Sequence, residues 1–69
     1  MPNTKQEEQY QILRLPDVVK ITGLSRSSIY AAISQDLFPK QLHIGPRSVG
    51  WLKNEIDEWI EQQIIHSRG

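Results

Sequence analysis

The sequence contains no cysteine and no apolar run long enough to cross a membrane, and its formal net charge is zero. Without cysteine, neither a disulfide nor a thiolate metal site can stabilise the fold. A membrane-spanning helix needs about 20 mostly apolar residues, and residues 1–8 lack the apolar segment of a signal peptide. We therefore expect a cytoplasmic protein that does not associate with membranes and depends on a small hydrophobic core.

The few charges are unevenly distributed along the chain. Residues 18–53 contain five basic side chains and one acidic side chain, a net charge of +4, whereas residues 54–69 contain one basic and four acidic side chains, a net charge of −3. Such a molecule can offer a basic face to phosphate although its total charge is zero. From charge alone, however, random scatter is an equally good interpretation.

A helix-turn-helix pattern occupies residues 15–35. Gly23 is a typical stop for the first helix, because glycine readily adopts the left-handed conformation found there. Ser25 is predicted to cap the second helix by accepting a hydrogen bond from a backbone N–H two or three residues later. Ile29 and Ile33 are four residues apart and should face inward. The short turn between the two helices is typical of the helix-turn-helix motif.

A β-hairpin is predicted after the second helix. Residues 41–44 alternate polar and apolar side chains, as a half-buried strand does, residues 45–48 have the composition of a turn, and residues 49–52 form the return strand. Residues 12–15 suit a short strand that joins the same sheet. The hairpin tip should present Arg47 to solvent.

The last helix is predicted to begin after Asn54, which is a good N-cap. One helical stripe, which is mostly apolar, is expected to consist of Ile56, Trp59, Ile60, Gln63 and Ile64. The acidic face is expected to consist of Glu55, Asp57, Glu58 and Glu61. Trp51 and Trp59 are expected in the core rather than stacked on bases. Ile64 and Ile65 would either close the core or bring copies of the chain together.

These elements predict an α+β, mostly helical fold: a small winged helix-turn-helix with a two-stranded hairpin as the wing and a C-terminal helix. The 69 residues suffice for one domain. We expect the domain to span residues 12–66 and to follow a flexible N-terminal tail, residues 1–11.

The sequence contains no recognisable catalytic or cofactor site. His43 and His66, the two histidines, have no partner at a metal-ligand spacing. The serines of the second helix lack a nucleophile motif, and no glycine-rich phosphate loop occurs. We therefore expect a protein that is not an enzyme and that needs neither metal nor cofactor.

The predicted partner is double-stranded DNA. Arg26 lies in the first turn of the second helix, residues 25–34, and in helix-turn-helix proteins that turn reaches base edges. Arg47, at the tip of the wing, is placed to contact phosphate or the minor groove. The predicted DNA-binding residues are Ser25, Arg26, Ser27, Ser28, Tyr30, Ala31, Lys40, Arg47, Ser48 and Lys53.

Five blocks of the chain, in this order and spacing, resemble the AlpA family of prophage regulatory proteins. They are LRLPDVV, TGLSRSSIY, FPK, GPRSVGW and EIDEWI. The resemblance implies an excisionase-like or MerR-like winged helix-turn-helix whose recognition helix is residues 25–34 and whose wing tip is residues 45–48. Members often have a basic residue after the tyrosine of the recognition helix. This chain has Ala31 there, which shifts the expected DNA contacts towards Arg26 and the wing.

The resemblance also implies a function. Members of the AlpA family control transcription on a prophage or genomic island, typically of an integrase gene, or act as excisionases that bind and bend attachment-site DNA. Several copies are expected to bind side by side. The alternative is a protein-interaction module that docks on an integrase or RNA polymerase through the acidic last helix. Charge reversal at Glu58 and Glu61 would abolish partner binding in that case and leave DNA binding intact.

Overall fold

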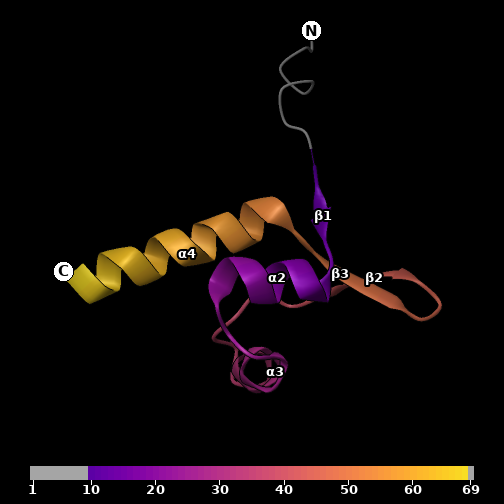
Figure 1. Ribbon diagram of the computed structural model, residues 1–69, viewed down its shortest axis with the longest axis horizontal. Coiled ribbons are helices and arrows are strands. Elements are labelled where there is room, and N and C mark those ends of the chain that lie inside the picture. The colour runs from indigo at the N-terminus through magenta and orange to yellow at the C-terminus, as the bar shows by residue number, and fades with distance from the viewer. Residues whose placement is uncertain (1–9, 69) are drawn as a thin grey trace, which may run out of the picture.

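The computed structural model of the protein describes residues 10–68 (Figure 1). Three helices and a small antiparallel sheet form the fold, in which the third strand lies between the other two. The elements in chain order are β1 (Ile12–Leu13), α2 (Leu15–Thr22), α3 (Arg26–Ser34), β2 (Leu42–Gly45), β3 (Ser48–Leu52) and α4 (Lys53–Arg68). This order confirms the predicted α+β winged helix-turn-helix. Of the predicted tail, residues 1–9 lie outside the described residues.

The sheet joins the N-terminal strand to the wing, as predicted. In β1, Ile12 pairs with Leu52 and Leu13 pairs with Trp51. The β2–β3 pairing is also antiparallel and contains an irregularity between His43 and Gly45. The predicted first strand is shorter than expected, because residue 15 already begins α2.

Gly50 allows the three strands to approach closely. It is buried in the central strand. A β-carbon at this position would lie 2.5 Å from Ile12 Cγ2, 2.9 Å from Ile44 Cδ1 and 3.0 Å from the carbonyl oxygen of Leu13. No larger residue fits without moving β1, so the sheet requires glycine here.

Local signals set the ends of the two motif helices. Gly23 ends α2 with a φ of 77° and donates its N–H to the carbonyl of Val19 at 2.8 Å, which confirms the predicted stop. The Ser25 hydroxyl accepts from the N–H of Ser28 at 3.1 Å, which confirms the predicted cap of α3. The other end of α3 has Asp36 in the left-handed region, with a φ of 61°.

The end of α3 is a Schellman motif. The N–H of Asp36 donates to the carbonyl of Ile33 at 3.0 Å, and the N–H of Leu37 donates to the carbonyl of Ala32 at 2.8 Å. These are the two bonds that define the motif, in which glycine usually occupies the left-handed position. The motif turns the chain sharply from α3 towards the wing.

The expected N-cap of the last helix was wrong. α4 begins at Lys53, directly after β3, so Asn54 lies inside its first turn. The N–H of Lys53 donates to the carbonyl of Gln11 at 2.8 Å. This backbone bond satisfies one of the donors left unpaired at a helix start. The strand therefore runs straight into the helix without a separate capping residue.

The core lies between the sheet, the two motif helices and the first half of α4. Its buried side chains are Leu13, Val18, Ile29, Phe38, Trp51 and Ile56. Both tryptophans have the structural role expected of them, although Trp59 is only half-buried. Half-buried side chains, among them Ile33 and Ile60, pack around this cluster.

Two surfaces are more exposed than the sequence predicted. Leu42 and Ile44 of β2 expose 39% and 45% of their surfaces, so the strand is not half-buried in the expected way. Figure 1 shows the reason, since the hairpin extends beyond the body of the molecule and no helix covers its tip. In α4 the predicted stripe is covered only as far as Ile60, and Gln63 and Ile64 are exposed.

Candidate nucleic-acid interface

The first turns of α3 form an exposed polar surface. Ile29 is fully buried and fixes the inner side of the helix, so residues 25–28 and Ala31 remain exposed. The serines and the alanine are small, which lets the helix backbone approach another surface closely. Arg26 contributes the positive charge of this turn. The N-terminus of α3 adds the partial positive charge of the helix dipole.

Arg26 lies against the aromatic ring of Tyr30. The guanidinium carbon is 6.0 Å from the ring centroid, at the outer limit of a cation–π contact. Tyr30 is half-buried, and its ring centroid lies 6.3 Å from that of Trp51 at an interplanar angle of 60°. Tyr30, one of the predicted DNA-binding residues, therefore connects the exposed arginine to the core and is only partly accessible.

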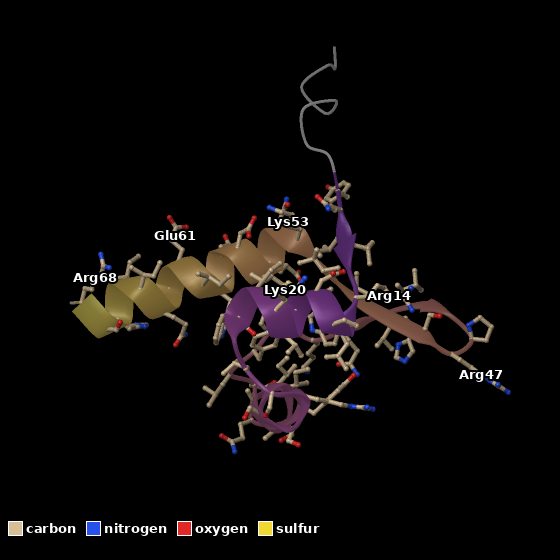
Figure 2. All side chains as sticks on the ribbon, viewed as in Figure 1. Arg14, Lys20, Arg47, Lys53, Glu61 and Arg68 are labelled. Carbon is tan, nitrogen blue, oxygen red and sulfur yellow. The ribbon has the colours of Figure 1, made fainter. Side chains whose placement is uncertain are left out.

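The hairpin tip is built by Pro46 and Arg47 between the paired residues Gly45 and Ser48. Neither tip residue has a positive φ, so the turn is neither type I′ nor type II′. Those two types match the twist of the flanking strands, which this turn does not do by itself. The irregularity next to the turn, between His43 and Gly45, accommodates it. Arg47 is exposed and points away from the body of the molecule (Figure 2), whereas Ser48 is half-buried.

The loop between α3 and the hairpin is held by both tryptophans. The indole N–H of Trp51 donates to the carbonyl of Pro39, and that of Trp59 donates to the carbonyl of Leu37, each at 2.9 Å. Phe38 packs edge-on against Trp59 with ring centroids 4.8 Å apart. These contacts fix the position of the hairpin relative to α3.

The two predicted lysines differ in their placement. Lys40 lies in the loop between α3 and the hairpin, is 73% exposed and forms an ion pair with Asp36 at 3.6 Å. Lys53 donates to Asp57 at 2.8 Å. Figure 2 shows Lys53 on the opposite side of the molecule from α3. Lys40 thus lies beside Asp36 and also lines a groove with Glu55 and Glu58 of α4, whereas Lys53 lies away from α3.

One basic residue near the wing was missing from the predicted set. Arg14 is exposed and lies beside the base of the hairpin (Figure 2). Its backbone N–H donates to the Asp17 carboxylate at 3.2 Å, which fixes the start of α2. The pairing of β1 with β3 brings it there, so the predicted place of this strand in the hairpin sheet was the signal that could have identified Arg14.

A groove of about 810 Å³ between the loop that follows α3 and the first half of α4 suits phosphate poorly. Its lining includes the acidic residues Asp36, Glu55 and Glu58 and the basic residue Lys40. Within residues 10–68, no group of three or more His, Asp or Glu side chains could hold a metal ion. No helix of the same region has the length and apolar character of a membrane span.

Comparison with known proteins supports the resemblance seen in the five sequence blocks. The family model described as prophage CP4-57 regulatory protein (AlpA) matches residues 11–64. The chain is 42% identical over 59 residues to the DNA-binding transcriptional activator AlpA of Escherichia coli (strain K12), covering 77% of this chain and 84% of that protein. It is 39% identical over 64 residues to uncharacterized protein ORF88 of Enterobacteria phage P4, covering 93% of this chain and 69% of that protein. The chain belongs to the AlpA family of prophage regulatory proteins.

Proposed function

We propose that this protein is a DNA-binding transcriptional regulator of a prophage or genomic island. Its α3 helix enters the major groove, and the hairpin tip contacts the neighbouring backbone or minor groove. The observation that carries the proposal is the exposed first turn of α3 with Arg26, on a chain whose hairpin tip also presents an exposed Arg47. The printed name of the E. coli relative, a DNA-binding transcriptional activator, supports the same function.

The two arginines have different roles in this proposal. Arg26 reads sequence by pairing with a base edge, for which a bidentate contact to guanine is the commonest choice. Arg47 anchors the protein on the backbone and carries no sequence information. Lys40 and Arg14 add phosphate contacts beside them, while the exposed serines and the N–H groups at the start of α3 donate to phosphate oxygens. Tyr30 acts mainly by supporting Arg26.

Binding of one copy should be modest. A single small module buries about 600–1,000 Å² of protein surface on DNA. The three basic phosphate contacts, Arg14, Lys40 and Arg47, give a slope of about −3 when the logarithm of affinity is plotted against the logarithm of salt concentration. Tight regulation therefore requires several copies on neighbouring sites.

The test compares three alanine variants that remove the same charge. Binding sites are first selected from a random duplex library, and affinities are then measured by fluorescence anisotropy at several salt concentrations. Arg26→Ala should lose preference among sequences by about 5–150-fold. Arg47→Ala should weaken all sequences about equally and reduce the salt slope by about 1. Arg68→Ala, at the far end of α4 (Figure 2), is the matched control and should bind a duplex that holds a single copy as the unmodified protein does.

Two results would contradict this proposal. One is that the unmodified protein binds no duplex at low salt. The other is that Arg26→Ala and Arg47→Ala bind as Arg68→Ala does, which would mean that the interface lies elsewhere.

Within this general function, we propose that the protein controls an integrase gene, promotes excision of the element, or does both. Footprinting across the attachment region of the host element separates these roles. Protection at the integrase promoter alone would support regulation without excision. Protection of repeated sites on an attachment arm would support work as an excisionase.

A further inference from the structure

The second half of α4 has a surface that neither the core nor the proposed DNA contacts use. Residues 61–68 are all exposed, and Ile64 and Ile65 expose 45% and 55% of their surfaces. Figure 1 shows this part of the helix extending past the rest of the molecule, on the opposite side from the hairpin. Ile64 borders a hollow that Ile21, Trp59 and Ile60 also line, but nearly half of its surface stays exposed. Neither isoleucine is buried in the core, so both are available for contact with another molecule.

Four residues of this segment share one helical face. Four positions of this face are Glu61, Ile64, Ile65 and Arg68, and they follow one another at steps of three, one and three positions. This is the spacing of neighbours on one side of an α-helix. We name these four residues the α4 stripe. Figure 2 shows Glu61 and Arg68 projecting from the same side of α4, away from α3.

The charges of the α4 stripe have no partner within the described part of the chain. The ion pairs found among residues 10–68 involve other residues. Glu61 and Arg68 cannot pair with each other, because seven residues of α-helix separate them by about 10.5 Å along the axis. Each charge is therefore available to another molecule.

The order of the four residues is self-complementary. Read forwards, the α4 stripe is acid, isoleucine, isoleucine, base, and read backwards it is base, isoleucine, isoleucine, acid. If two such helices lie antiparallel with their midpoints between residues 64 and 65, each Glu61 faces the Arg68 of the other copy. The isoleucines then meet at the centre, so one contact satisfies all four positions on both chains.

We propose that the α4 stripe binds a second copy of this chain, in an antiparallel contact with twofold symmetry. Such an isologous contact uses the same patch on both subunits and closes at two copies. The partner is a second copy because the pattern complements itself, whereas a different protein would have to match it by chance. Since the α4 stripe faces away from α3, both DNA-binding faces remain free in the pair (Figure 2).

The contact is small, and its strength depends on concentration. Two isoleucines and one ion pair from each copy bury far less surface than a stable dimer needs, which is about 800 Å² per partner. In free solution the association should be weak. Because the α4 stripe faces away from α3, the two α3 helices of the pair point in opposite directions, and the pair can hold two DNA duplexes at once. This last step rests on the proposed DNA binding, but the pairing itself does not.

The main experiment is a charge exchange, read out by sedimentation at high protein concentration. Glu61→Arg and Arg68→Glu should each weaken self-association about tenfold, because each places like charges opposite one another at both ends of the contact. The double exchange restores both ion pairs and should restore association. A mixture of the two single variants should associate better than either alone, since their charges are complementary.

Glu55→Arg is the matched control for charge, because it makes the same change on α4 at an exposed residue off the stripe. It should leave self-association unchanged. Equal association of all variants would overturn the proposal. A double exchange that fails to recover would also overturn it, because only the antiparallel register predicts that recovery.

If sedimentation detects no association of the unmodified chain, disulfide trapping tests whether two copies pair through the α4 stripe. The chain has no cysteine of its own, so introduced thiols give an unambiguous product. A mixture of Glu61→Cys and Arg68→Cys should form the mixed disulfide, whereas each variant alone should not, because identical positions lie about 10 Å apart along the pair. A mixture that yields no more crosslink than Glu55→Cys with Arg68→Cys would overturn the proposal.

Neither solution experiment contains DNA, so their outcome does not depend on the proposed function. The link to DNA is tested by measuring whether the protein brings together two labelled duplexes of about 12 base pairs, each of which holds one module. Glu61→Arg should no longer bring the two duplexes together, and adding Arg68→Glu should restore this. If no variant binds either duplex, the proposed function fails while the pairing stands.

Discussion

The two tryptophans allow one substitution to be compared in two environments. Trp51 is fully buried, whereas Trp59 is half-buried and its hydrogen bond is exposed. Each indole N–H donates at 2.9 Å to a carbonyl of the loop that connects α3 to the hairpin. Replacing either by phenylalanine removes this donor and keeps an aromatic ring. The difference between the two variants therefore measures what burial adds to the same bond.

The expected cost is larger for Trp51→Phe. The carbonyl of Pro39 loses its partner in a partly buried site, and an unsatisfied buried acceptor costs about 1–3 kcal/mol. If the smaller ring leaves a cavity of about 40 Å³, the cavity adds about 1 kcal/mol. The total of about 2–4 kcal/mol is a large part of the roughly 3–5 kcal/mol available to a domain of this size. Trp59→Phe should cost only about 0.5–1.5 kcal/mol, because water replaces the donor to Leu37.

Urea unfolding checks this prediction. Helix content is followed by circular dichroism, and the fluorescence of the remaining tryptophan provides a second probe of the same transition. Both probes should give the same midpoint for each variant. Equal losses for Trp51→Phe and Trp59→Phe, or a greater loss for Trp59→Phe, would refute the reasoning that burial decides the strength of these bonds.

Three further substitutions test local features of the fold. Gly50→Ala should lower the free energy of unfolding by about 1–3 kcal/mol, because its β-carbon collides with β1 and β2; a loss below about 0.5 kcal/mol in urea unfolding would mean that the sheet adapts easily. Asp36→Gly should raise the free energy of unfolding by about 0.5 kcal/mol, because glycine adopts the left-handed conformation without strain; a lower free energy of unfolding would contradict this. Ser25→Ala should cost about 1 kcal/mol by removing the cap of α3. Ser25→Asp should restore that stability and still weaken DNA binding, since it places a negative charge at the proposed interface; unchanged affinity in the anisotropy assay would argue against that interface.

The parts of the fold that the sequence predicted correctly have short-range causes. Gly23 and Ser25 determine where one helix stops and the next begins through bonds that span three or four residues. The spacing between Ile29 and Ile33 sets which side of α3 faces the core in the same local way. Such features depend little on the rest of the molecule, so the sequence alone predicts them.

The features that the sequence did not predict depend on contacts between distant segments. Asn54 is not the cap of α4, because the N–H of Lys53 finds its acceptor in Gln11, which is 42 positions earlier in the chain. Periodicity predicted an apolar stripe along the whole helix, but the body of the protein reaches only as far as Ile60. Lys53 follows the hairpin in sequence, yet the turn into α4 places it away from α3 (Figure 2).

Trp51 connects the core to the proposed DNA-binding surface, so stability and binding should be coupled. Trp51 pairs with β1 through its backbone, lies against Tyr30 beneath Arg26, and donates to the loop that leads to the hairpin. One side chain thus influences both the recognition helix and the position of the wing. Trp51→Phe should therefore weaken DNA binding even at temperatures where the variant remains folded, because the more buried of the two bonds that fix the spacing of helix and wing is lost. Trp59→Phe, which keeps the Trp51 contacts, should bind with nearly unchanged affinity.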